Sequence, residues 1–137
     1  MGQTVQDVMT RDPGAVEASA PIIEAAEIML REDVGSVPIL EDGRLAGMLT
    51  DRDIVLRVVA EGRDARTITC AEIASRQLAT IDPQQPLEEA LRLMGEHQVR
   101  RLPVVEEDGR LVGIVAQADI ARNDPSEVGH LVEEISS

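Results

Sequence analysis

The chain has 137 residues, which is enough for one ordinary domain with a single shared core. Its 26 acidic and 13 basic residues give a formal net charge of −13, and it contains no Lys, Phe, Tyr or Trp. This composition argues against nucleic-acid binding, against a surface for anionic lipid and against lysine-dependent chemistry, although a few Arg side chains could still hold a small anion.

Targeting and redox signals are also sparse. Residues 1–12 lack the basic start and apolar run of a secretory signal, and no stretch approaches the roughly 20 apolar residues that a membrane span needs. Cys70 is the only cysteine, which excludes an intramolecular disulfide. The sequence therefore predicts a cytoplasmic protein without membrane contact.

The first half of the chain predicts a helix, a hairpin and a second helix, preceded by a short segment at 5–10. The apolar positions that follow Pro21 have the spacing of one helical face: Ile22, Ile23, Ala26, Met29 and Leu30. Strands are expected at 37–40 and 45–49, around a turn at 41–44. The second helix is expected to run from Thr50 to about Ala60.

The second half repeats this pattern. After a polar linker at 61–66 and a short segment at 70–75, it predicts a helix behind Pro86, strands at 102–105 and 111–115, and a shorter helix at 119–122. The residues that follow resemble a capping box that opens a final helix reaching Ile135.

An internal alignment supports two copies of one unit. Pro21 aligns with Pro86, an offset of 65 (86 − 21), and one extra acidic residue in the second copy raises the offset to 66 after the first strand. Thereafter GRLAGMLTDRDI aligns with GRLVGIVAQADI. We therefore predict one repeat over 2–62, a second over 67–124 and a C-terminal helix or tail over 125–137.

These motifs resemble the CBS domain pair, also called the Bateman module. The resemblance rests on DVMT, VPIL and EDGRLAGMLTDRDI in the first copy and on RLPVVEEDGRLVGIVAQADI in the second, and it covers roughly residues 2–123. The runs GMLTDRDI and EHQVRRLPV are also similar to small stand-alone bacterial CBS pairs of the hypoxic-response type.

The resemblance implies an α+β fold of two β-α-β-β-α units, related by a pseudo-twofold axis and packed sheet to sheet, and commonly a homodimer. It implies a regulatory role in which AMP, ADP, ATP or S-adenosylmethionine binds between the repeats and no cofactor is required. For a stand-alone pair of this kind we expect action on a separate protein partner, which the sequence does not name, or a role as a ligand buffer.

The strongest candidate for ligand binding is the segment from Gly47 to Asp53. A carboxylate at Asp53 can accept hydrogen bonds from both ribose hydroxyls, and the hydroxyl of Thr50 can meet a phosphate oxygen. The same two residues also satisfy the pattern of a helix capping box, which is a purely structural alternative. In the second copy Ala116 replaces the hydroxyl while Asp119 remains, so a reciprocal cap is impossible there.

Three further residues are weaker candidates for ligand contacts. Arg101, with Arg100 before it, precedes the strand where the family often places residues that face the ligand, and its alternative role is a surface ion pair. Arg52 is similar in character, and Thr80 stands at the family's frequent threonine before the first helix.

The sequence shows little sign of a catalytic or metal-binding site. His97 and His130 show no metal-ligand spacing, and Asp51 and Asp53 lack a nucleophile, a general base or a third carboxylate, so we predict no enzyme and no metal site. Two alternatives to a ligand sensor stay open: a ligand-free scaffold for dimerisation and protein interaction, and redox or metal sensing through Cys70.

Overall fold

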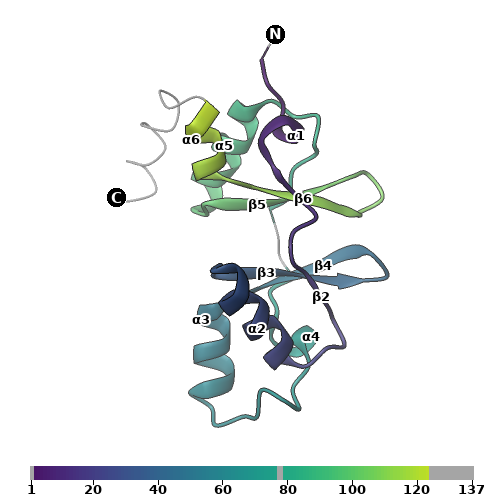
Figure 1. The fold of residues 1–137 in the computed structure, drawn as a ribbon, viewed down its shortest axis with the longest axis vertical. Helices are drawn as coiled ribbons and strands as arrows, with labels where there is room; N and C mark the ends of the chain where they lie inside the picture. The colour runs from purple at the N-terminus through teal and green to yellow at the C-terminus, as the bar shows by residue number, and fades with distance from the viewer. Residues whose placement is uncertain (1, 77–78, 124–137) are drawn as a thin grey trace. The chain divides into compact units, whose positions relative to one another are not determined.

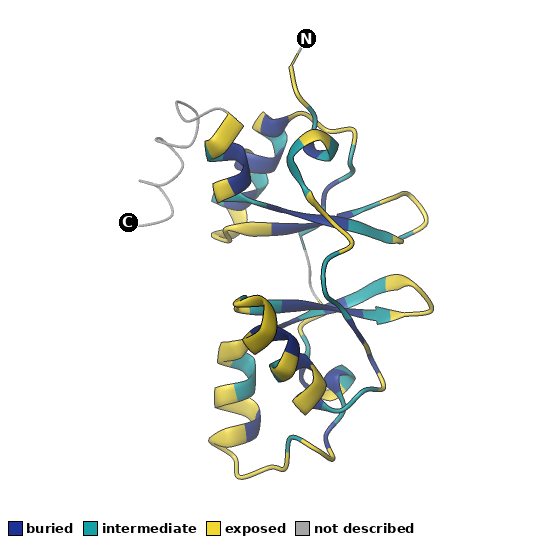
Figure 2. Cartoon of the chain, in the orientation of Figure 1, coloured by how far each residue is buried: buried dark blue, intermediate teal, exposed yellow. Residues whose placement is uncertain are grey.

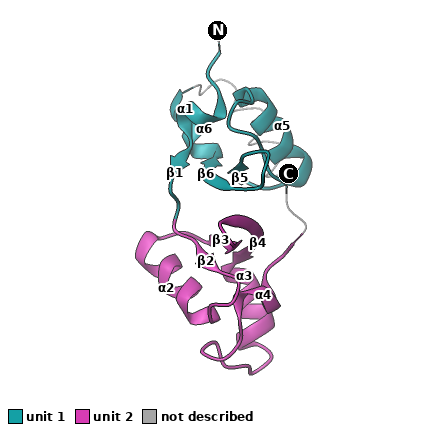
Figure 3. Ribbon diagram, turned by 90° about the vertical axis from the view of Figure 1, so that its right-hand side faces the viewer, with its two compact units in different colours: residues 1–13, 79–137 teal, residues 14–78 magenta. Residues whose placement is uncertain are grey.

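The computed structural model describes residues 2–76 and 79–123, and the chain divides into two compact units (Figures 1 and 3). Unit 1 comprises residues 1–13 and 79–137, and unit 2 comprises residues 14–78. The helix predicted in the C-terminal tail and His130 lie outside the described residues. No helix among the described residues is long and apolar enough to cross a membrane.

Unit 2 is a three-stranded sheet with helices against it, in the sheet order β2-β3-β4. Strand β2 pairs in parallel with β3, and β3 pairs antiparallel with β4. Its elements are β2 (Val16–Glu17), α2 (Ile22–Glu32), β3 (Ser36–Glu41), β4 (Arg44–Thr50), α3 (Asp51–Ile54), the π-helix η1 (Val55–Val59) and α4 (Cys70–Ile73).

Unit 1 repeats this plan with the sheet order β1-β6-β5. The segment at Ile81 forms a parallel bridge with Val104 of β5, at the place that β2 takes beside β3. Its elements are α1 (Val5–Val8), β1 (Thr10–Arg11), α5 (Leu87–His97), β5 (Arg101–Val105), β6 (Leu111–Ala116) and α6 (Gln117–Asn123). The helices and hairpins predicted within the described residues are therefore present, and the α+β prediction is confirmed.

The compact units do not coincide with the repeats read from the sequence, because the leading segments are exchanged. Helix α1 begins the first repeat but lies in unit 1, where Val5 N donates to Gln85 O at 2.9 Å. Helix α4 opens the second repeat but lies in unit 2, where Cys70 N donates to Ala20 O at 2.8 Å. The two divisions differ because an alignment of repeats compares residue types along the chain, whereas a compact unit is defined by the segments that contact one another in space.

Two aligned glycines permit this exchange. A Cβ at Gly47 would lie 2.8 Å from Ser75 O, and one at Gly113 would lie 2.7 Å from Thr10 O. Each glycine therefore lets an incoming segment pair closely with the strand that carries it, which is a backbone role rather than a ligand-binding one.

Each unit has its own aliphatic core, which compensates for the missing aromatic residues (Figure 2). In unit 2 the face of α2 that is buried consists of Ile22, Ala25, Ile28 and Met29. The predicted apolar face of this helix was partly wrong, because Leu30 is 85% exposed and Ile23 is 38% exposed. The buried stripe is rotated from the predicted one, since the sheet covers only one side of the helix.

The helix predicted from Thr50 to about Ala60 is present, but its second half has π geometry. Ala60 N donates to Val55 O at 2.8 Å, a bond that spans five residues. Within this wider segment, Arg57 Nη1 donates to Ile73 O at 2.9 Å. That bond ties the helix to α4, the segment that belongs to the other sequence repeat.

Candidate functional site

Thr50 and Asp53 form a complete capping box at the junction of β4 and α3. Asp53 N donates to Thr50 Oγ1 at 3.1 Å, and Thr50 N donates to Asp53 Oδ2 at 3.0 Å. Thr50 also lies opposite Ser36 in the β3–β4 register. The structural alternative considered for these two residues is therefore correct, and it holds both side chains in one orientation.

Capping leaves part of this pair available for other contacts. Thr50 uses a lone pair to accept, so its hydroxyl proton stays available, and Asp53 uses one of its two carboxylate oxygens. Neither Asp53 Oδ1 nor the Thr50 hydroxyl proton has a partner within 2–76 or 79–123. Helix capping and ligand binding are thus compatible at this site, since they use different atoms.

Arg52 lies between the two capping residues, on the first turn of α3. Its side chain is exposed, and it makes no ion pair with any residue that the structure describes. A cation at this place can offset the charge of an anionic group beside Thr50.

Asp119 occupies the equivalent place in unit 1, but its contacts differ. Its Oδ2 accepts from Ala116 N at 2.9 Å, and its Oδ1 is paired with Arg122 Nη2. The residue is only 7% exposed, the one buried charged residue in the described parts of the chain. The hydrogen bond from the backbone of residue 116 to the acid is therefore kept although the threonine hydroxyl is missing. The other carboxylate oxygen of Asp119 forms the ion pair with Arg122.

Arg101 and Thr80 belong to the same unit as Asp119. Arg101 is exposed at the start of β5 and lies opposite Ala116 in the β5–β6 register. No ion pair joins Arg101 to a described residue, so the alternative role of a surface ion pair is not observed within 2–76 and 79–123. Thr80 is half-buried and precedes Ile81, whose amide donates to Pro103 O at 3.1 Å.

The six predicted residues therefore fall into two groups of three. Thr50, Arg52 and Asp53 lie within four consecutive residues of unit 2, whereas Thr80, Arg101 and Asp119 come from three segments of unit 1. Register brings Arg101 to the strand end that precedes α6, where Asp119 lies.

Sequence reasoning missed Arg122 and Gln117. The spacing of three between Asp119 and Arg122 on one helix is a signal for an ion pair and could have identified the first. Gln117 Nε2 is buried without a hydrogen-bond partner in the described structure, while its backbone N donates to Arg100 O at 2.8 Å. No sequence pattern marks that unsatisfied amide.

Two acidic concavities lie at equivalent places in the units, beside the hairpin turns. One is lined in unit 2 by residues that include Glu17, Glu41 and Asp42. The other is lined in unit 1 by Asp82, Pro83, Gln84, Glu106, Glu107 and Asp108. Their carboxylates repel phosphate, so neither is a suitable place for a nucleotide.

Cys70 packs as a small apolar side chain in the core of unit 2. Burial, with a smaller contribution from the charge of Glu24, raises the pKa of its thiol to about 11. Because the thiolate is the reactive form, this environment argues against redox sensing. Within 2–76 and 79–123, no group of three or more His, Cys, Asp or Glu residues could hold a metal ion.

Comparison with known proteins places these features in one family. The model described as "CBS domain" matches residues 5–60 and 70–126. The chain is 46% identical over 123 residues to the CBS domain-containing protein YhcV of Bacillus subtilis (strain 168), covering 90% of this chain and 86% of that protein. It is 45% identical to Hypoxic response protein 1 of Mycobacterium tuberculosis (strain H37Rv), covering 89% and 85%.

Solved structures agree. The crystal structure of Hypoxic Response Protein I with two coordinated zinc ions is 45% identical, with a TM-score of 0.80, and the match covers 88% of this chain and 98% of that one. The CBS domain pair of protein MJ0100 with 5′-methylthioadenosine and S-adenosyl-L-methionine has a TM-score of 0.79 at 27% identity, covering 93% and 99%. CBSX2 in complex with AMP has a TM-score of 0.78 at 27% identity, covering 91% and 98%. The chain therefore belongs to the CBS domain family and carries two CBS repeats.

Proposed function

We propose that this chain is a non-catalytic regulatory module that binds an adenosine-containing ligand at Thr50 and Asp53. The observation that carries the proposal is the unused hydrogen-bonding capacity of this pair: one carboxylate oxygen of Asp53 and the hydroxyl proton of Thr50. Related CBS pairs hold AMP, or S-adenosyl-L-methionine with 5′-methylthioadenosine, which supports a ligand of this class.

The proposed chemistry divides the ligand between the two side chains. An ionised carboxylate accepts hydrogen bonds from ribose hydroxyls, and a threonine hydroxyl donates to a phosphate or carboxylate oxygen of the ligand. Arg52, with Arg101 as a weaker candidate, supplies positive charge in a chain whose net charge is −13. AMP, ADP, ATP and S-adenosylmethionine are the ligands to compare, and Thr80 is a further candidate contact.

Regulation would follow from a population shift. A ligand changes the conformation of a protein only by the difference between its affinities for two states. We propose that occupancy stabilises one arrangement of a homodimeric module and so changes its affinity for a separate protein partner.

Titration of the purified protein with AMP, ADP, ATP and S-adenosylmethionine tests the proposal. Because the chain has no Trp, Tyr or Phe, a co-purified adenine nucleotide would dominate its ultraviolet absorbance. We expect Asp53→Asn to weaken AMP binding at least about tenfold, since it removes a charge-assisted hydrogen bond.

Asp51→Asn is the matched control, because it removes a charge from the same helix turn without touching the capping box. Equal affinities for AMP in the wild type, the Asp53→Asn variant and the Asp51→Asn control would contradict the proposed contact. Failure of all four ligands to bind the wild type would contradict the sensor itself.

A ligand-free interaction scaffold is the second candidate. It is favoured by exposed apolar side chains on the helices of unit 2: Leu30, Val55, Leu56 and Val59. A surface of this kind is typical of protein–protein contacts. Leu30→Ser with Val59→Ser would then abolish association, and Asp53→Asn would leave it unchanged.

A further inference from the structure

The third residues of α3 and α6, Asp53 and Asp119, occupy equivalent places but have different partners. Asp53 and Asp119 each accept a hydrogen bond from the backbone amide three residues earlier, at 3.0 Å and 2.9 Å. The second oxygen of Asp119 is paired with Arg122, whereas no described residue forms a hydrogen bond or ion pair with the second oxygen of Asp53. Leu56 occupies the place equivalent to Arg122 in unit 2 (122 − 66 = 56), so no guanidinium is available there.

The exposed fractions of the two side chains indicate how readily Arg122 can leave the Asp119 carboxylate. The Asp119 side chain is 9% exposed, so its charge needs a partner, while the Arg122 side chain is 69% exposed. An arginine that remains mostly in water contributes little to stability and can rotate away without leaving a buried cation. Arg122 is therefore a competitor for the Asp119 carboxylate rather than a permanent part of the core.

From this difference we infer that Arg122 determines the number of ligands the chain binds, by closing Asp119 to the ribose of an adenosine-type ligand. Each chain then has one open acid, Asp53, whose second carboxylate oxygen is unpaired in the described structure, and one closed acid, Asp119, whose second oxygen is paired with Arg122. The inference rests on the proposed function, since it concerns how a ligand of that class is distributed between the two repeats.

The experiment measures AMP stoichiometry by calorimetry in the wild type and in two variants at position 122. Arg122→Leu introduces the residue of the equivalent place in unit 2, and Arg122→Ala removes the guanidinium without adding a branched side chain. We expect about one AMP per chain in the wild type and about two in each variant, the second bound more weakly because Ala116 has no hydroxyl.

An Asp53→Asn background isolates the second site. There the chain with Arg122 should bind AMP only at the weakened Asp53→Asn site, and the chain with Arg122→Leu should bind one further AMP. Arg110→Ala is the matched control, because it removes an exposed cation from the hairpin turn of the same unit. Thermal unfolding followed by circular dichroism verifies that each variant is folded.

The outcomes separate this inference from the proposed function. Two AMP molecules per wild-type chain, or an unchanged single site in both folded Arg122 variants, would overturn the role of Arg122 and leave the sensor intact. If none of the proteins binds AMP, ADP, ATP or S-adenosylmethionine, the sensor and this inference are overturned together. A second site that also appears in Arg110→Ala would mean that net charge, not the closed acid, controls stoichiometry.

Discussion

The start of α3 in unit 2 and the start of α6 in unit 1 descend from the same motif and differ by a few side chains. In unit 2 a complete capping box holds Asp53 and leaves one carboxylate oxygen unpaired. In unit 1 the loss of one hydroxyl at Ala116 goes with an ion pair from Arg122 and with burial of the acid. An aspartate present in both repeats therefore has different partners in each: Asp53 has one oxygen that no described residue pairs with, and Asp119 has none.

The largest loss of unfolding free energy is expected from substituting the aligned glycines that both units have, Gly47 and Gly113. Gly47→Ala and Gly113→Ala should each lower the free energy of unfolding by more than about 3 kcal/mol, because the new Cβ would meet a backbone oxygen at 2.8 Å and 2.7 Å. Urea unfolding measures the loss. Gly35→Ala is the control, since its nearest atom is the end of the Asp51 side chain at 3.3 Å. Losses as small as the control's would mean that the crossing segments are not closely paired.

The next effect separates the two acids. Asp119→Ala should lower the free energy of unfolding by about 2–3 kcal/mol, because it leaves Ala116 N without its partner and removes the Arg122 pair. Asp53→Ala should cost about 1 kcal/mol, the usual effect of losing a cap. Denaturant unfolding of the two variants tests this ranking. Equal losses would mean that the burial of Asp119 adds nothing.

A smaller effect is expected from rebuilding the missing half of the cap. Ala116→Thr should restore the reciprocal box with Asp119 and raise the free energy of unfolding by about 0.5–1 kcal/mol, whereas Thr50→Ala should lower it by about as much. Thermal unfolding of both variants measures the two changes. A destabilised Ala116→Thr variant would show that the Asp119–Arg122 pair excludes the hydroxyl.

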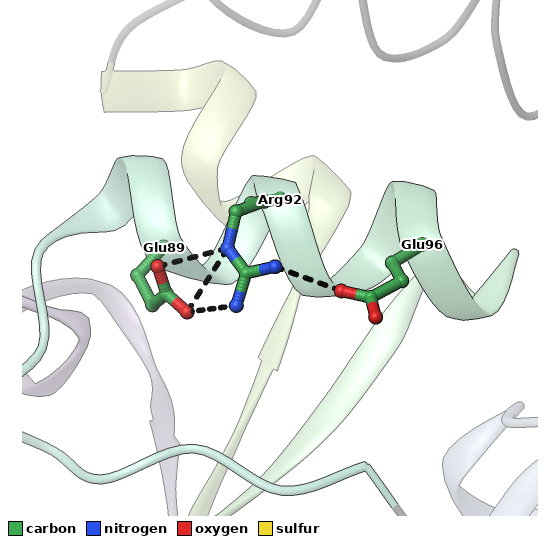
Figure 4. Close-up of polar contacts among 3 residues, drawn as sticks. All are labelled: Glu89, Arg92 and Glu96. Carbon is green, nitrogen blue, oxygen red and sulfur yellow. Dashed lines mark hydrogen bonds and ion pairs between the residues drawn. The ribbon is translucent and has the colours of Figure 1, made fainter.

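The smallest effect concerns the exposed faces of the long helices. In unit 1, Arg92 pairs with Glu89 at 2.5 Å and with Glu96 at 2.8 Å (Figure 4). The hydrogen bond from Arg92 lowers the pKa of Glu89 below its usual value. Glu27 stands in place of Arg92 in unit 2 (92 − 65 = 27), so this arrangement is specific to α5.

The sign of the resulting pH dependence follows from the lowered pKa. The stabilisation from Glu89 is present above the pKa of the unfolded chain, roughly 4.3, and is lost as the pH falls through the lower pKa of the folded state. Glu89→Gln should therefore flatten the fall of the unfolding free energy on acidification. Glu88→Gln is the control for loss of charge. If the unfolding free energies of the two variants depended on acidic pH in the same way, the pairing of Glu89 with Arg92 would be contradicted.

Much of the fold could be predicted because repetition and periodicity are local in the chain. The helix behind Pro21, the hairpin around Gly43 and their copies in the second half follow from spacing and turn residues, and the structure confirms them. The exposure of Leu30 was not predicted, because helical spacing defines an apolar stripe but not which part of it the sheet covers.

The candidate site could be predicted only in part. The capping role of Thr50 and Asp53 was one of two alternatives that the pattern left open, and the structure confirms it without removing the other. Their ligand contacts, and those of Arg52, Arg101 and Thr80, stay predictions. The environment of Asp119 depends on Arg122, a residue one helix turn away that the repeat alignment did not mark.

Two successive copies of one aliphatic helix–hairpin–helix unit are evident from the amino acids alone, because alternation, helical spacing and glycine turns act over a few neighbouring residues. The exchange of the leading segments between the compact units, and the pairing of Asp119 with Arg122 while Asp53 keeps an oxygen unpaired by any described residue, become visible only in the folded chain. Burial and pairing depend on which distant segments come into contact, and that choice minimises the free energy of the whole unit rather than of any stretch within it.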